Sequence, residues 1–282
     1  MKLSDILKIS IDILKNSGVE TPITDTHILI SYVLKIPRWK IITEKERILS
    51  SEEVENILKV INKRASGVPV AYIIKKKEFF GIKFYVDERV LIPRPETEIL
   101  VEKVLEKLKD KKDKLVGLDI GVGSGAISIA LLKNIPNLYM FGVDVSEDAL
   151  KVANINSELK LTTNKLKLVK SNIFSNLDRN IKFDFIVSNP PYISRKDYLN
   201  LKVEVKKEPK VALISGKEGL SFYERIIKEG KNFLKGKGFI AFEVGYNQSK
   251  KVKGLFLKND FKDIEIYKDL NGIDRVVIGF IK

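Results

Sequence analysis

The composition is informative first through what it lacks: the 282 residues include no cysteine and a single histidine, His27. Without cysteine the chain has no disulfide framework and no thiolate zinc site, and one histidine alone does not make the usual zinc sites. We therefore predict that the protein holds no metal, and we interpret His27 as a structural residue.

Long apolar stretches are also missing. No run approaches the roughly 20 apolar residues that a membrane span needs. Residues 2–14 alternate charged with apolar side chains and lack the continuous apolar block of a secretory signal. The expectation is a cytoplasmic protein that does not associate with membranes.

Acidic residues are outnumbered, with 37 Asp and Glu against 51 Lys and Arg, so the formal net charge is +14. An excess of this sign favours contact with an anionic partner such as RNA, a ribosome-bound factor or an acidic protein surface. Many lysines are scattered along predicted helix faces, however, and a lysine-rich composition without functional meaning explains the charge equally well. The length is sufficient for about two domains with a well-buried core.

Residues 1–66 are predicted to form a small bundle of amphipathic helices. Apolar residues recur at three- and four-residue spacing in two stretches, and Ser50 with Glu53 forms a capping-box pattern ahead of a third. The first helix should end near Gly18, and the second should run from residues 24–25 to a point before Pro37. The side chains expected to be buried are Leu3, Ile6, Leu7, Ile11 and Leu14 in the first helix and Ile28, Leu29, Tyr32 and Val33 in the second.

Residues 67–91 are predicted to form a β-hairpin connector to the larger domain, which occupies residues 92–282. The connector is rich in aromatic and β-branched residues, which favour short strands around a turn. The residues on which this prediction rests are Val70, Tyr72, Ile74, Phe79, Phe80, Gly81, Phe84 and Val86.

A glycine-rich loop follows an apolar strand predicted over residues 115–120. The loop reads Gly121-Val122-Gly123-Ser124-Gly125, and its glycines allow a tight turn and close approach of a ligand to the backbone. The spacing is Gly-x-Gly-x-Gly instead of the dinucleotide Gly-x-Gly-x-x-Gly, and no lysine makes it a P-loop.

Polar residues end the next two predicted strands. The strand over residues 138–143 ends at Asp144, whose carboxylate can accept hydrogen bonds from both ribose hydroxyls of a nucleoside. The strand over residues 166–169 leads to Asn172, which could hydrogen-bond the edge of an adenine, and Ile173, which could pack on the adenine face. We predict a nucleoside site at this edge of the sheet.

The stretch Asn189-Pro190-Pro191-Tyr192 follows another buried strand, over residues 183–187. The prolines end that strand at once, so Asn189 lies at its carboxyl end, where open α/β sheets bind ligands. The Asn189 amide and the Pro190 carbonyl can accept the two hydrogens of a planar NH2 group, and the Tyr192 ring can lie against its face. Further helices and strands, with an Asn-Gly hairpin before the last strand, complete a predicted sheet of seven strands with an antiparallel end.

The order of these elements resembles that of class I S-adenosylmethionine-dependent methyltransferases, a Rossmann-like α/β fold. Asn-Pro-Pro-Tyr resembles the signature of enzymes that methylate exocyclic or amide nitrogen. The chain is moreover similar to the HemK/PrmC family, the N5-glutamine methyltransferases of peptide chain release factors. The segments that carry this similarity are Pro69–Tyr72, Ile92–Glu98, Glu208-Pro209, Ala212-Leu213, Gly219-Leu220, Phe222-Tyr223, Glu243 with Gly245 and Gln248, and Asp269–Gly272 with Arg275.

The resemblance implies methyl transfer from S-adenosylmethionine to the glutamine of a release factor's Gly-Gly-Gln loop, with S-adenosylhomocysteine as product. Asn189 and Pro190 would be catalytic, and together with Pro191 and Tyr192 would bind the substrate. The cofactor would be held by Gly121, Val122, Gly123, Ser124, Gly125, Asp144, Asn172, Ile173 and Asn189. The helical bundle would recognise the substrate, the enzyme would act as a monomer, and nucleic acid would not be required.

Two alternatives remain open from the sequence. A DNA or RNA adenine-N6 methyltransferase would use the same acceptor pair on a flipped base, although no large insertion for reading nucleic acid is evident. A non-catalytic scaffold, recruited to RNA or the ribosome by its +14 charge, is the other. The intact glycine loop, Asp144 and Asn-Pro-Pro-Tyr stretch argue against the scaffold.

Overall fold

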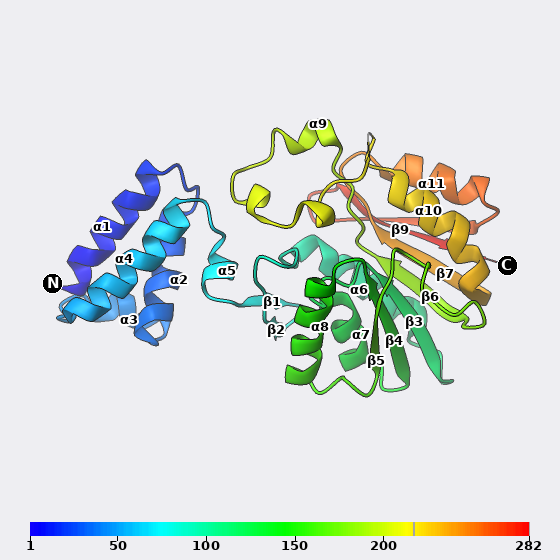
Figure 1. Ribbon diagram of the computed structural model, residues 1–282, viewed down its shortest axis with the longest axis horizontal. Helices are drawn as coiled ribbons and strands as arrows, with labels where there is room; N and C mark the ends of the chain where they lie inside the picture. Colours follow the sequence, from blue (N-terminus) through cyan, green and yellow to red (C-terminus); the bar gives the residue numbers. More distant parts are fainter. Residues whose placement is uncertain (217, 282) are drawn as a thin grey trace. The chain divides into compact units, whose positions relative to one another are not determined.

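The computed structural model describes residues 1–216 and 218–281, which form two compact units. The N-terminal unit comprises Met1–Lys76 together with Lys202–Lys207, and the sheet unit comprises Lys77–Leu201 and the chain from Glu208 onward. Figure 1 shows both units, and each is described by itself.

The N-terminal unit is a helical bundle. Its elements are α1 (Leu3–Asn16), α2 (Pro22–Leu34), α3 (Arg38–Thr43), α4 (Ser51–Ala65), the short α5 (Val70–Ile73) and a 3-10 turn (Val205–Lys207). The predicted capping box is confirmed, because the Ser50 hydroxyl accepts from the Glu53 amide and the Glu53 carboxylate accepts from the Ser50 amide. The core unites apolar side chains of α1, α2 and α4.

A buried arginine joins three segments of this unit. Arg64 of α4 is only 7% exposed and pairs with Asp25 of α2 at 2.7 Å and with Glu204 at 2.6 Å. A buried cation left without partners would be strongly destabilising. This pairing therefore ties residues 202–207 to the bundle, although their chain neighbours on both sides belong to the sheet unit.

Two local predictions in this unit were wrong. Residues 70–73 are helical and not a strand: after Pro69, the amides of Ile73 and Ile74 bond back to the carbonyls of residues 69 and 70. Short alternating apolar runs do not distinguish the two structures, and here packing on the bundle core decides for the helix. Tyr32 is 48% exposed whereas Ile30 is buried, because the buried residues of α2 are Asp25, Thr26, Leu29 and Ile30, and Tyr32 lies beyond this stripe, near the end of the helix.

The predicted hairpin at Phe79–Phe84 is confirmed and belongs to the sheet unit. Strands β1 (Lys77–Phe79) and β2 (Ile82–Phe84) pair antiparallel. The turn residues Phe80 and Gly81 have φ of 50° and 69°, as a two-residue type I′ turn requires. The Phe80 amide also donates to Glu98 of helix α6 (Pro95–Leu108) at 2.8 Å, which fastens the hairpin to the unit.

The large sheet has the predicted seven strands, in the order β5-β4-β3-β6-β7-β9-β8. Strands β3 to β7 are parallel, while β9 runs antiparallel to both of its neighbours, β7 and β8. The strands are β3 (Leu115–Ile120), β4 (Leu138–Asp144), β5 (Leu166–Lys170), β6 (Phe183–Ser188), β7 (Leu234–Glu243), β8 (Lys262–Lys268) and β9 (Asp274–Phe280). This topology confirms the predicted class I methyltransferase fold.

Helices cover both faces of the sheet (Figure 1). On one face α10 (Ser221–Gly230) and α11 (Ser249–Lys258) pack with Ile186 and Phe242 in one apolar cluster. Phe185 and Val187 alternate with Ile186 along β6 and therefore point to the other face. There α6 (Pro95–Leu108) lies against β7 and β9, while α7 (Ala126–Asn134) and α8 (Glu147–Leu159) lie against β4. Short helices α9 (Arg195–Tyr198), Lys210–Ala212 and Lys231–Phe233 lie in the connections.

Candidate active site

The strand order reverses between β3 and β6. The chain passes from β3 outward through β4 to β5 and then returns to β6, on the other side of β3. In open α/β sheets the crevice at the carboxyl ends of such strands is the usual ligand site. The loop that follows β3 and the loop that follows β6 consequently lie side by side.

The loop after β3 has the geometry that the glycines were expected to allow. Gly121, Gly123 and Gly125 all have positive φ, of 76°, 52° and 80°, a conformation that other residues adopt at a cost. A Cβ built at Gly121 would meet no atom within 4 Å, so backbone conformation, not a protein neighbour, is the reason for glycine there. The loop is fastened to β4, because the Gly121 and Val122 amides donate to the Val143 carbonyl at 2.8 and 3.0 Å.

Asp144 lies at the carboxyl end of β4 and joins two backbone segments. Its Oδ2 accepts from the Gly123 amide at 3.1 Å and its Oδ1 from the Ser146 amide at 2.9 Å. Burial raises the pKa of Asp144, while the hydrogen bonds from these amides favour its charged form. Each carboxylate oxygen has two lone pairs, so both oxygens retain capacity for hydroxyl donors.

The turn after β5 carries Asn172 and Ile173. Ile173 is 4% exposed and has φ of 58°, an unusual conformation for a β-branched residue. The Ser171 hydroxyl supports this turn by donating to the Ile173 carbonyl at 2.9 Å. Strain of this kind is concentrated at functional sites. The Asn172 Oδ1 accepts from Arg225 of α10 at 3.2 Å, which leaves its NH2 group as the free polar end of the side chain.

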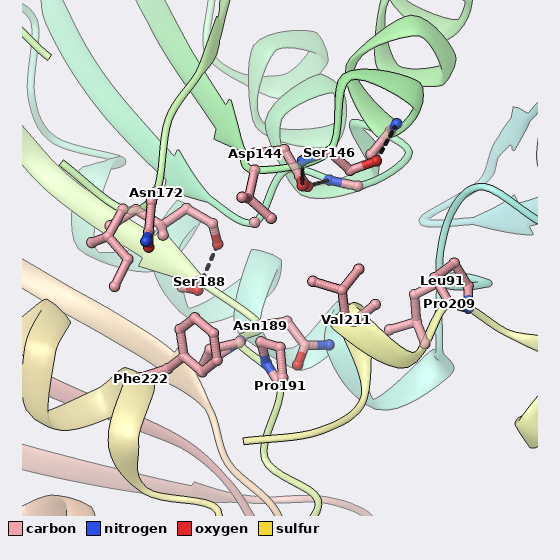
Figure 2. A pocket seen from close by; sticks show the side chains of 18 of the residues that line it. Leu91, Asp144, Ser146, Asn172, Ser188, Asn189, Pro191, Pro209, Val211 and Phe222 are labelled. Carbon is pink, nitrogen blue, oxygen red and sulfur yellow. Dashed lines mark hydrogen bonds between the residues drawn. The ribbon is translucent and has the colours of Figure 1, made fainter. Parts of the chain in front are cut away.

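Asn189 follows β6 and is held from behind. Its Nδ2 donates to the Thr97 hydroxyl at 3.1 Å, and Thr97 in turn donates to the buried carboxylate of Glu243. The amide oxygen is therefore the end of the Asn189 side chain that is left for a ligand. Figure 2 shows Asn189 and Pro191 on one side of the pocket, and Asp144 and Asn172 on another.

These segments enclose one cavity of about 320 Å³, a size usual for small-molecule sites. Of the residues predicted to form the site, Gly121, Gly123, Asp144, Asn172, Ile173, Asn189, Pro190 and Pro191 line it. Val122, Ser124, Gly125 and Tyr192 do not. Val122 and Ser124 are buried, and Gly125 is the N-cap residue of α7.

Tyr192 lies away from the lining and packs against the apolar cluster of α10 and α11. Its carbonyl accepts from the Gln248 side chain at 3.1 Å. Burial raises the pKa of Tyr192, so its phenol stays neutral. The expected stacking of this ring on the substrate remains a prediction.

Several lining residues were not singled out from the sequence for this site, among them Arg89, Ser188, Val211, Phe222 and Arg225. Arg89 and Val211 come from connections whose course the sequence pattern does not give, whereas Ser188 is the last residue of β6 and Phe222 and Arg225 are in α10. Arg89 is oriented by Asp87: although burial opposes it, hydrogen bonds from Arg89 and Tyr85 lower the pKa of Asp87 to about 2. For Phe222 the sequence did offer an indication, because Phe222-Tyr223 is one of the segments in which the chain resembles the HemK/PrmC family.

In the described part of the chain, no grouping of three or more His, Asp and Glu side chains could hold a metal ion. No helix within residues 1–216 and 218–281 is long and apolar enough to cross a membrane.

Comparison with solved structures supports the fold. The hMettl16 catalytic domain, solved in complex with an RNA hairpin, superposes with a TM-score of 0.60 over 89% of this chain and 90% of that one, at 16% identity. Residues 95–216 match the methyltransferase small domain family and residues 5–74 match the PrmC N-terminal domain. The fold is thus that of a class I methyltransferase.

Curated relatives narrow the class to one family. The release factor glutamine methyltransferase of Fusobacterium nucleatum is 41% identical over 277 residues, covering 98% of this chain and 78% of the relative. That of Aquifex aeolicus is 43% identical over 255 residues, covering 90% of each chain. The chain belongs to the release factor glutamine methyltransferase family.

Proposed function

We propose that this protein transfers a methyl group from S-adenosylmethionine to the side-chain nitrogen of the glutamine in the Gly-Gly-Gln loop of a peptide chain release factor. The observation that supports this most is the orientation of Asn189. Its amide nitrogen donates to the buried Thr97 hydroxyl, which is not part of the cavity lining, so its oxygen is left to accept an N–H of a substrate carboxamide.

The cavity fits the proposed cofactor. Gly121 and Gly123, both with positive φ, present backbone without side chains to the cavity, and the Asp144 oxygens have spare lone pairs for ribose hydroxyls. Ile173 offers an apolar face for a base, and Asn172 offers its NH2 group to the edge of that base. When bound, S-adenosylmethionine supplies a methyl group activated by its sulfonium.

The chain's own residues are proposed to act on the carboxamide. An amide nitrogen is a poor nucleophile because its lone pair is delocalised into the carbonyl. If the Asn189 oxygen and the Pro190 carbonyl each accept one N–H, the nitrogen is fixed in position and the positive charge that develops on it is stabilised. No strong base is required, because methylation acidifies the nitrogen and the proton leaves afterwards.

Further parts of the proposal concern partners and compartment. The N-terminal bundle would recognise the release factor, whose acidic surface would complement the net charge of +14. The enzyme would act as a monomer in the cytoplasm and would not require nucleic acid.

The test is methyl transfer in vitro. The protein is incubated with labelled S-adenosylmethionine and either a release factor, the same factor with its loop glutamine changed to alanine, or duplex DNA and RNA. We expect one methyl group, located by mass spectrometry on that glutamine of the unaltered factor only. Labelled nucleic acid, or an unlabelled release factor, would refute the proposal.

A variant then tests the role of Asn189. Asn189→Ala should retain cofactor binding and lose methyl transfer by roughly 100-fold or more, as removal of one transition-state partner usually does. Asn200→Ala, at an exposed asparagine of the connection after β6, serves as the matched control. Wild-type turnover in Asn189→Ala would remove this residue from catalysis.

A further inference from the structure

Two segments that the proposed chemistry does not use meet Asn189 behind the cavity. Thr97 stands in the first turn of α6, within the proline-rich stretch 92–98, and Glu243 is the last residue of β7. The register of the sheet pairs Ser188 of β6 with Phe242 of β7. Asn189 and Glu243 come one residue later on these parallel strands, so they point to the same face, where α6 packs.

The three side chains form a directed chain of hydrogen bonds. Thr97 and Glu243 are 4% and 2% exposed, so water does not substitute for their partners. The Thr97 hydroxyl has a single proton, which it donates to the Glu243 carboxylate. Its oxygen is then an acceptor for Asn189 and receives the amide Nδ2 at 3.1 Å.

This arrangement decides which end of the Asn189 amide faces the cavity. We propose that Thr97 and Glu243 are positioning residues that keep the amide nitrogen of Asn189 turned inward and its oxygen turned toward the substrate. The inference rests on the proposed function, in which that oxygen accepts a substrate N–H. The start of α6 and the end of β7, which are remote from each other in sequence, would thus both orient Asn189.

The direction of the chain depends on the charge of Glu243. A protonated Glu243 would donate to Thr97, Thr97 would donate to Asn189, and the amide would have to turn its oxygen inward. Burial raises the pKa of Glu243 to about 7, and Glu96 raises it further, while the hydrogen bond from Thr97, the charge of Arg275 and a direct hydrogen bond from the Asn189 side chain lower it. The direct bond from Asn189 also requires its amide nitrogen to face the charged Glu243. The other titratable groups that face Glu243 are the phenols of Tyr192 and Tyr223, whose pKa values are raised by burial so that they stay neutral.

Steady-state kinetics with a release factor provide the first test. Thr97→Val keeps the shape of the side chain but removes the hydroxyl, and should lower kcat by roughly 10- to 100-fold with KM and cofactor affinity within about 2-fold of wild type. Thr97→Ser should restore kcat to within about 5-fold, and the exposed Thr163→Val should match wild type. Equal loss in Thr97→Ser and Thr97→Val, or no loss in either, would overturn the inference.

The charge dependence is tested by the pH profile. Wild-type kcat should fall as pH drops through about 7, and this acidic limb should disappear in Glu243→Gln, which accepts from Thr97 without titrating. A limb that persists unchanged in Glu243→Gln would show that Glu243 does not set the orientation.

A measurement without substrate separates this inference from the proposed function. Hydrogen exchange of the Asn189 side-chain NH2 protons, followed by 15N NMR, should be slow in wild type and Thr97→Ser and at least 10-fold faster in Thr97→Val. If this protection is seen while release factors are not methylated, the proposed function fails and the positioning stands. If Thr97→Val leaves exchange unchanged, the positioning fails whatever the substrate.

Discussion

The geometry of Asp144 yields a quantitative prediction for cofactor binding. Each of its oxygens accepts one backbone amide, from Gly123 and from Ser146, and each has a further lone pair for a ribose hydroxyl. Asp144→Asn preserves the shape but replaces one oxygen by an NH2 group. The new NH2 group would face the backbone N–H of Gly123 or Ser146, so two donors would oppose each other. The same NH2 group could not accept the proton of a ribose hydroxyl.

The expected loss follows from these contacts. Hydrogen bonds to a charged group contribute about 1.5–3 kcal/mol, and an orphaned buried N–H costs about 1–3 kcal/mol. The orphaned N–H destabilises the free protein as well as the complex, so it contributes little to the change in binding. The free energy of binding should therefore weaken by about 1.5–3 kcal/mol in total. Since each 1.4 kcal/mol is tenfold, the Kd for S-adenosylmethionine should rise roughly 10- to 150-fold.

Isothermal titration calorimetry with S-adenosylmethionine and S-adenosylhomocysteine measures this directly. Asp148→Asn is the matched control, because Asp148 is exposed on α8, pairs with the exposed Lys151 and is not among the residues that line the cavity; its Kd should change less than about 3-fold. A folded Asp144→Asn protein whose Kd lies within about 2-fold of wild type would refute the assignment of the ribose to Asp144.

Two further predictions concern stability. A Cβ at Gly117 would lie 2.3 Å from the Phe185 ring, so Gly117→Ala should destabilise the protein by about 1–3 kcal/mol. Gly254 is at an exposed helix position where a Cβ would meet nothing within 4 Å, so Gly254→Ala should stabilise the protein by about 0.5–1 kcal/mol. Urea titration measures both free energies of unfolding, and equal effects would contradict the packing argument. Burial raises the pKa of Asp119 and of Glu243 to about 7, above their values in the unfolded chain. The folded state therefore binds more protons between about pH 4 and 7, and the free energy of unfolding should fall as pH rises through that window, by up to about 1.4 kcal/mol per pH unit for each group. Thermal unfolding across this range should show a smaller slope in Asp119→Asn, and an unchanged slope would exclude Asp119 as a source.

Much of the sheet could be predicted from local sequence patterns. Buried parallel strands are continuous apolar runs, and the polar residue or glycine that ends each run marks the sheet edge where ligands bind. The strands β3, β4, β5 and β6 and the cap at Ser50 were consequently predictable within a residue or so. The structure of residues 70–74 was not predictable, because so short an apolar run fits the two-residue period of a strand as well as the 3.6-residue period of a helix.

What the sequence determined by itself is the class of fold and the order of its motifs, since each motif is a local chemical requirement written in consecutive residues. The sequence also showed which segments resemble the family, but for most of these segments it did not show what their side chains do. Only the tertiary structure decided that Thr97, Asn189 and Glu243, far apart in the chain, share one chain of hydrogen bonds. Such a meeting depends on strand register and helix packing, which are set by contacts across the whole unit, and no single stretch of sequence contains them.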